Sequence, residues 1–182
     1  ASDVYKRQSY NTLTLSETGQ VRAQSTVIGL RDIATDNKVI VQSGGVLSNT
    51  VSLVVGSLGS QNSLIVSNGG IVYAPQTLIG QQASASNNAV IVTGSGSLLS
   101  NTGPIQVGVL GANNSMSVSA SGRVSSVGTS LIGGRNTSYS NLVVLNGGTW
   151  SNLGTATLTI GTNSTLNLGG NALVITNGGY LY

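Results

Sequence analysis

The sequence predicts an all-β chain folded as a right-handed parallel β-helix, a solenoid of about six to seven coils with about 26 residues in each coil. Three observations predict this fold. A glycine returns at a nearly fixed interval, the apolar residues around it alternate with period two, and no stretch shows the period of about 3.6 residues that marks a helix. The repeated glycines are Gly19, Gly45, Gly70, Gly96, Gly122 and Gly148. A repeat of this length is typical of units that bury their apolar face only by stacking on copies of themselves.

The segment before each glycine is predicted to be a strand, because its side chains alternate between apolar and mixed positions. The sixth and fourth residues before the glycine are apolar and are predicted to face inward: Leu13, Val39, Leu64, Val90, Met116 and Leu142, then Leu15, Val41, Val66, Val92, Val118 and Val144. The mixed position between them is predicted to face outward: Thr14, Ile40, Ile65, Ile91, Ser117 and Val143.

A second strand is predicted to follow the glycine. Its second residue is predicted to face inward: Val21, Leu47, Val72, Leu98, Val124 and Trp150. Its first residue is predicted to lie on the surface: Gln20, Val46, Ile71, Ser97, Arg123 and Thr149.

A third strand is predicted before a second set of glycines, each of which follows isoleucine or valine: Gly29, Gly56, Gly80, Gly108, Gly133 and Gly161. Three residues before these glycines, small polar and large apolar residues alternate from unit to unit: Thr26, Leu53, Thr77, Ile105, Ser130 and Leu158. The full repeat is therefore a pair of coils, about 52 residues.

Asparagine recurs eight residues before the first glycine, at Asn11, Asn37, Asn62, Asn88 and Asn114. Ser140 breaks the series beside Asn141. Asparagine tolerates a left-handed backbone, so the column suits a recurring corner. A ladder of amides bonded along the stack is the other interpretation.

Residues 1–8 are interpreted as foreign to the protein, because DVYKRQ reads like one translated frame of a transposon adapter used in sequencing libraries. Residues 9–182 are predicted to be a single β-helix domain and a fragment of a longer repeat protein, since the ends of such a stack would expose unpaired strand edges. The interval from Gly148 to Gly179 is longer than the others, which predicts an irregular segment at about residues 161–172.

Composition argues against several function classes. The formal charge is +3, and no run of Lys or Arg interleaved with aromatic residues is present, so we expect no nucleic-acid partner. No apolar stretch is long enough for a membrane-spanning helix. His and Cys are absent, and Glu17, Asp32 and Asp36 are the acids outside the first eight residues. We therefore expect no catalytic residues, metal site or cofactor.

Segments such as SLIVSNGGIV with TLIG, and NNAVIVTGSGSLLSNTG with IQVG, resemble the repeat of bacterial autotransporter passenger regions and PEP-CTERM-associated surface proteins. The resemblance covers about residues 10–179 and departs at Ala120 and Ser121, where the pattern has Asn-Gly. It implies a secreted β-helical stalk at the bacterial outer surface, often a platform for adhesion. It carries over no catalytic residues.

Four side chains are candidate ligand contacts, namely Tyr73, Arg123, Arg135 and Tyr139. They are aromatic or basic and are predicted to lie outward or in turns, where they would meet host or environmental glycans. Trp150 is a weaker candidate because it falls in the inward column. Asp32 and Asp36 are interpreted as a solvated loop beside Arg31 and Lys38.

The function expected from these observations is a non-catalytic stalk or display surface of a secreted or surface-anchored bacterial protein, with adhesion as an added role. Its partners would be glycans or surfaces and the adjoining coils of the longer chain. One alternative is a carbohydrate-binding or carbohydrate-active β-helix whose active residues lie elsewhere. A second alternative is a functional amyloid or an ice-binding solenoid.

Overall fold

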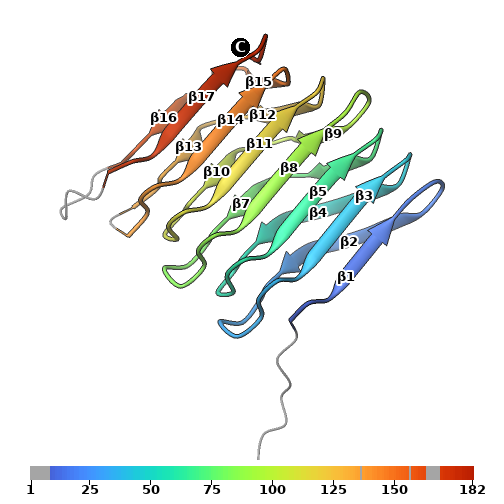
Figure 1. Ribbon diagram of the computed structural model, residues 1–182, viewed down its shortest axis with the longest axis horizontal. Helices are drawn as coiled ribbons and strands as arrows, with labels where there is room; N and C mark the ends of the chain where they lie inside the picture. The colour runs from blue at the N-terminus through green and yellow to red at the C-terminus, as the bar shows by residue number, and fades with distance from the viewer. Residues whose placement is uncertain (1–8, 136, 156, 163–168) are drawn as a thin grey trace, which may run out of the picture.

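The computed structural model describes residues 9–182 except 136, 156 and 163–168 (Figure 1). It is an all-β parallel solenoid of about six turns, with about 26 residues in each turn. No helix occurs in the part of the chain that the structure describes. The predicted fold class is confirmed. Residues 1–8 and half of the predicted irregular segment, residues 163–168, lie outside the described residues.

The first face of the solenoid is a seven-stranded parallel sheet whose strands follow one another in chain order along the rod (Figure 1). Each strand lies between the asparagine column and the first glycine corner. The strands are β1 (Thr12–Leu15), β3 (Lys38–Gln42), β5 (Ser63–Ser67), β8 (Ala89–Thr93), β11 (Ser115–Ser119), β14 (Leu142–Asn146) and β17 (Ala172–Thr176).

The second sheet forms the other two faces. The second face follows the glycine corner and comprises β6 (Ile71–Ala74), β9 (Leu98–Asn101), β12 (Arg123–Val127), β15 (Thr149–Leu153) and β18 (Tyr180–Leu181). The third face comprises β7 (Thr77–Ile79), β10 (Ile105–Val107), β13 (Ser130–Ile132) and β16 (Leu158–Ile160). Two long strands, β2 (Gln20–Ile28) and β4 (Val46–Val55), run across both faces and join them into one sheet.

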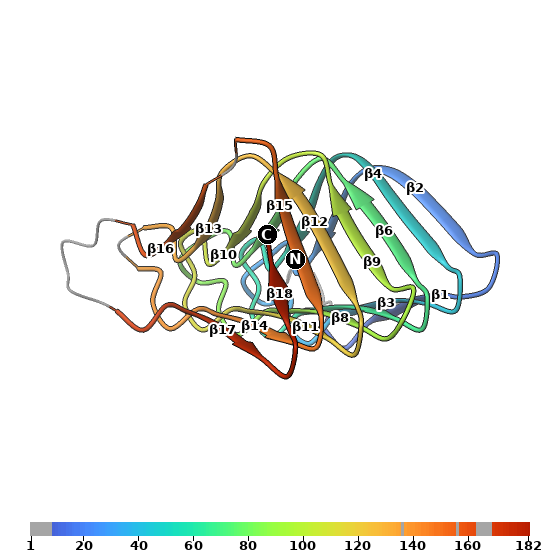
Figure 2. The ribbon, with the colours of Figure 1, turned by 90° about the horizontal axis from the view of Figure 1, so that it is seen from above.

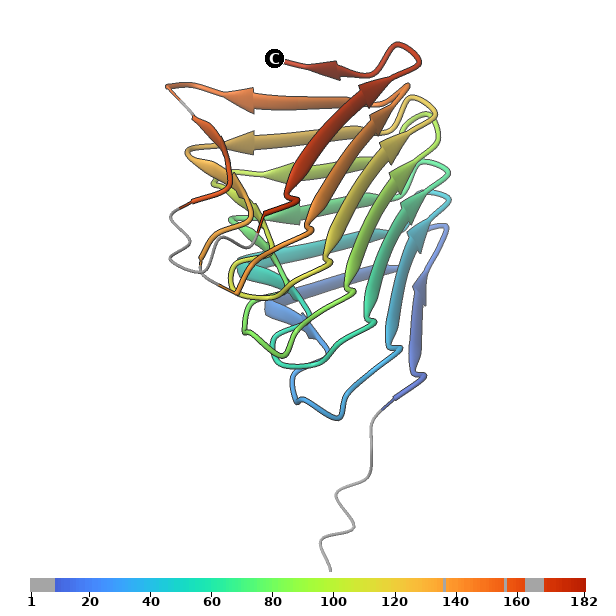
Figure 3. The same cartoon turned by 60° about the vertical axis from the view of Figure 1, so that its left-hand side comes forward.

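The faces meet at two kinds of edge. Figure 2 shows the tight glycine corner between the first and second faces at the right. Longer loops connect the third face back to the first, and they stack along the opposite edge of the rod (Figure 3). The pleat turns alternate side chains inward on every face, so one continuous core runs along the axis.

The predicted inward columns of the first face hold through Met116 and Val118, but the prediction is wrong in the next coil. Val143 and Leu145 pair with them and are fully buried, whereas Leu142 lies outward and Val144 is half-buried. The reason is the corner: two residues separate Leu145 from Gly148, whereas three separate Val118 from Gly122. Because this corner is one residue shorter, every position counted back from the glycine moves by one residue, and the inward and outward residues of the strand are exchanged.

The opposite shift occurs on the second face, where the prediction for Leu98 is also wrong. Leu99 pairs with Val72 and is fully buried, while Leu98 is outward. The preceding corner has an extra residue, so Ser97 rather than Gly96 continues the glycine column: Arg123 N donates to Ser97 O. Ser97, predicted to be a surface residue, is fully buried, and its hydroxyl donates to Thr93 O at 2.7 Å.

The first glycine column is required by close backbone approach. A Cβ on Gly45 would meet the Leu15 carbonyl of the preceding coil, and one on Gly70 would meet the Val41 carbonyl. Neither glycine has a positive φ; among the six predicted structural glycines only Gly96 does. These glycines let successive coils stack closely at the corner.

The second glycine column has a different cause. All six residues have φ between 69° and 81°. In addition, a Cβ on Gly56 would collide with the side-chain amide of Asn88. The same collision recurs between Gly29 and Asn62, Gly80 and Asn114, and Gly108 and Asn141. The glycines therefore make room for the asparagine column.

The asparagine column is a hydrogen-bonded ladder. The Oδ1 atom of each asparagine accepts a hydrogen bond from the backbone N–H of the asparagine one coil earlier, at 2.9–3.2 Å. The ladder runs through Asn11, Asn37, Asn62, Asn88, Asn114, Asn141 and Asn171. Asn62, Asn88, Asn114 and Asn141 are fully buried. Asn141, not Ser140, continues the series. The left-handed position is the residue before each ladder asparagine, such as Gln61 (φ 60°) or Asn87 (φ 57°). The ladder interpretation is thus the correct one.

Candidate functional site

Tyr73 and Arg123 project from the second face of the rod. Tyr73 lies between Ser48 and Ser100 of the adjacent strands and is 44% exposed. Arg123 is exposed between Leu98 and Thr149. The two side chains lie two coil steps apart, with one coil between them, which corresponds to about 10 Å along the axis. Both predicted outward positions are confirmed.

Arg135 and Tyr139 lie elsewhere, in the loop that leads from the third face back to the first. Both are exposed. Ser138 N donates to Arg135 O, and Asn113 N donates to Tyr139 O, so the loop backbone is tied to itself and to the preceding coil. The structure therefore divides the four candidate residues into a pair on a flat sheet and a pair on a loop edge.

Two further aromatic residues belong to the second face. Tyr180 and Tyr182 are 63% and 60% exposed, and their rings pack edge to face with centroids 6.3 Å apart. Tyr180 pairs with Thr149, which pairs with Arg123. Tyr180 and Tyr182 are not among the candidates predicted from the sequence, because they follow Gly179, outside the six aligned units. The period-two alternation around Leu181 was the available signal.

Trp150 is excluded from any outward platform. It is fully buried, and its Nε1–H donates to the Ser126 hydroxyl at 2.8 Å. The prediction that it belongs to the core is confirmed.

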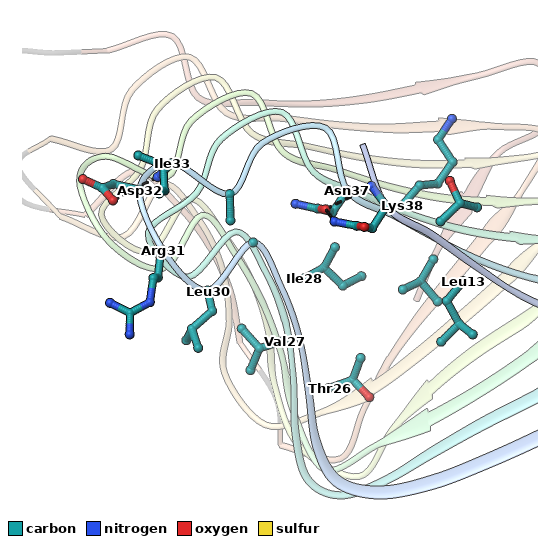
Figure 4. A pocket seen from close by; sticks show the side chains of 15 residues that line it. Leu13, Thr26, Val27, Ile28, Leu30, Arg31, Asp32, Ile33, Asn37 and Lys38 are labelled. Atoms are coloured by element: carbon teal, nitrogen blue, oxygen red, sulfur yellow. Dashed lines mark hydrogen bonds between the residues drawn. The ribbon is translucent and has the colours of Figure 1, made fainter. Parts of the chain in front are cut away.

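A pocket opens at the N-terminal end of the rod, between β1, the end of β2 and the loop that follows (Figure 4). Leu13, Ile28 and Val39 contribute apolar side chains to it. Its acid, Asp32, is exposed and accepts a hydrogen bond from the N–H of Ile33 at 2.9 Å. The lining combines inward residues of the end coil, such as Leu13, with exposed loop residues such as Leu30 and Arg31. Leu13 is 42% exposed in this end coil, whereas its equivalent Leu64 in the middle of the rod is fully buried.

Asp32 and Asp36 do not form part of a larger acidic group. In the described ranges, no three His, Cys, Asp or Glu side chains come together in a way that would hold a metal ion. Likewise, the described part contains no helix of the length and apolarity needed to cross a membrane.

Comparisons with models of protein families, with curated proteins and with solved structures find no match.

Proposed function

We propose that this chain is a non-catalytic stalk or display surface of a secreted or surface-anchored bacterial protein. The observation that carries the proposal is that the residues of the repeated columns contact neighbouring coils. The asparagines bond to one another, both glycine columns make room for neighbouring coils, and the inward columns fill the core. Each of these repeats serves to stack coils, and none of them is aimed at a ligand.

Such a rod suits a spacer because its length scales with its number of coils. Placement among autotransporter passenger regions or PEP-CTERM-associated proteins rests on the resemblance of the repeat alone. That context would put the rod at the bacterial outer surface, where its long side would face host or environmental material.

The second face favours an added adhesive role. Tyr180, Tyr182 and Arg123 are exposed on adjacent or nearby coils of one flat sheet. Aromatic rings stack on sugar C–H groups, and a guanidinium pairs with carboxylate or sulfate. An acidic glycan is thus the ligand class that fits this face best.

Three experiments test the spacer role, the absence of catalysis and the adhesive role separately. For the spacer, the chain is inserted between a surface anchor and a reporter domain, and antibody access to the reporter is expected to increase. Depolymerisation of polysaccharide by the purified chain, lost in Asp32→Asn or Asp36→Asn, would overturn the non-catalytic proposal.

For adhesion, the purified chain is applied to an array of neutral and acidic glycans. Binding of acidic glycans is expected to fall with Arg123→Ala or Tyr180→Ala and to persist with Arg135→Ala, whose side chain lies on the loop edge. No binding, or equal losses in all three variants, would contradict adhesion through the second face and leave the spacer proposal intact.

A further inference from the structure

Two inward positions alternate along the rod in opposite phase. With coils counted from each ladder asparagine, the last inward position of the second face holds, in coils 1 to 6, Ala23, Asn49, Ala74, Asn101, Ser126 and Asn152. The first inward position of the third face holds Thr26, Leu53, Thr77, Ile105, Ser130 and Leu158. Coils 1, 3 and 5 thus combine a small residue with a hydroxyl. Coils 2, 4 and 6 combine an asparagine with a large aliphatic residue. We call them hydroxyl coils and amide coils.

Hydrogen bonds join each hydroxyl coil to the amide coil that follows it. Thr26 Oγ1 donates to Asn49 Oδ1 at 2.7 Å. Thr77 and Asn101 share two bonds, at 3.2 and 2.9 Å. In the last pair, Ser130 Oγ donates to Asn152 Oδ1 at 3.3 Å. These side chains lie in the interior, where unpaired amides are costly.

The boundary after an amide coil lacks this bond. The Nδ2 atom of Asn49 is buried without a hydrogen-bond partner, and Thr77 in the next coil bonds to Asn101 instead. Ser130 Oγ accepts a bond across the next such boundary, but the donor is the backbone N–H of Ile105, which any residue at that position supplies.

Side-chain volume alternates with the hydrogen bonds. Leu53 and Ile105 are fully buried, and Thr77 lies between them. Two amide coils in contact would place two large aliphatic residues against each other. Two hydroxyl coils in contact would leave a void. Both faults are costly in a close-packed interior.

We propose that the coils recognise their neighbours through this two-class pattern, so that the rod can gain or lose coils in adjacent pairs but not singly. The inference concerns assembly of the rod and holds whatever the rod displays.

Three deletions in the full chain test it, each made between equivalent ladder positions so that the asparagine ladder stays in register. Deleting residues 62–87 removes coil 3 and puts two amide coils in contact. Deleting residues 88–113 removes coil 4 and puts two hydroxyl coils in contact. Deleting residues 62–113 removes both, and coil 2 then meets coil 5, an amide coil followed by a hydroxyl coil as in the parent.

Thermal unfolding followed by circular dichroism is the measurement. The pair deletion is expected to melt cooperatively close to the parent. Each single deletion is expected to melt roughly 5–20 °C lower, or to lose the β-sheet signal altogether. The proposal is overturned if the pair deletion is destabilised as much as either single deletion, or if all three melt alike.

Discussion

Thr77 and Asn101 exchange two hydrogen bonds inside the solenoid, the hydroxyl donating to Oδ1 at 3.2 Å and accepting from Nδ2 at 2.9 Å. Both residues are buried, at 0% and 2% exposure. We expect Thr77→Val to leave the Asn101 amide underbonded and to lower the free energy of unfolding by about 1–3 kcal/mol. Urea denaturation measures the change, with Thr102→Val, at an exposed threonine, as the control.

The double variant Thr77→Val with Asn101→Leu separates this pair from a simple packing effect. Removing both partners leaves no orphaned amide, so the combined loss is expected to be smaller than the sum of the single losses by about 0.5–3 kcal/mol. Additive losses would show that the hydrogen bonds do not couple the two coils.

The asparagine ladder predicts that a negative charge at position 88 lowers the stability of the fold. In the parent chain, Asn88 Nδ2 donates to Asn114 Oδ1 at 3.1 Å. Asn88→Asp removes this donor and places a carboxylate oxygen against the Asn114 Oδ1 atom. Burial raises the pKa of such a carboxyl, because the charged form is poorly solvated there. Its folded-state pKa would lie above the unfolded value, so the variant is expected to regain stability as the pH falls below that raised pKa.

Thermal melts of Asn88→Asp at several pH values check this, with Asn87→Asp as the control. Asn87 is exposed and already has a positive φ of 57°, which aspartate tolerates. Equal melting of the two variants at neutral pH would show that the ladder adds little to stability.

The second glycine column predicts a difference between two glycines of similar φ. Gly56 and Gly128 have φ of 76° and 87°. A Cβ on Gly128 would meet nothing within 4 Å, whereas one on Gly56 would strike the Asn88 amide. We expect Gly128→Ala to cost about 1 kcal/mol from backbone strain and Gly56→Ala about 2–5 kcal/mol. Denaturant unfolding of both variants provides the comparison, and similar losses would refute the role of the ladder contact.

The sequence predicts the fold and most of the core because the alternation around the glycines is itself the physical cause of burial. It fails at Leu98 and Leu142 because alignment on a glycine assumes corners of equal length. A corner that gains or loses one residue moves the strand without changing its composition. Burial of the flanking residues, not the glycine, fixes the register.

The hydrogen-bond partners of the alternating hydroxyl residues do not follow from the sequence. The sequence shows Thr26, Thr77 and Ser130 alternating with larger residues, but Asn49 and Asn101 lie in a different strand. Only the fold brings them within hydrogen-bonding distance across a coil boundary. On the surface, outward position follows from alternation, as at Tyr73, whereas the separation of Arg135 from Arg123 depends on the path of the loop.

The corner that departs from the Asn-Gly pattern offers a stabilising substitution. Ala120 and Ser121 both have a positive φ, 48° and 67°, where other corners place residues such as Asn68 and Gly69. A serine side chain is strained in this region, and Ser121 is exposed, so its hydroxyl contributes no core packing. Ser121→Gly is therefore expected to raise the free energy of unfolding by about 1 kcal/mol and the melting temperature by roughly 2–4 °C. Ser125→Gly, in the middle of β12, is the control and is expected to destabilise because glycine weakens a strand interior. A lower melting temperature for both variants would mean that Ser121 contributes more at the corner than its backbone strain costs.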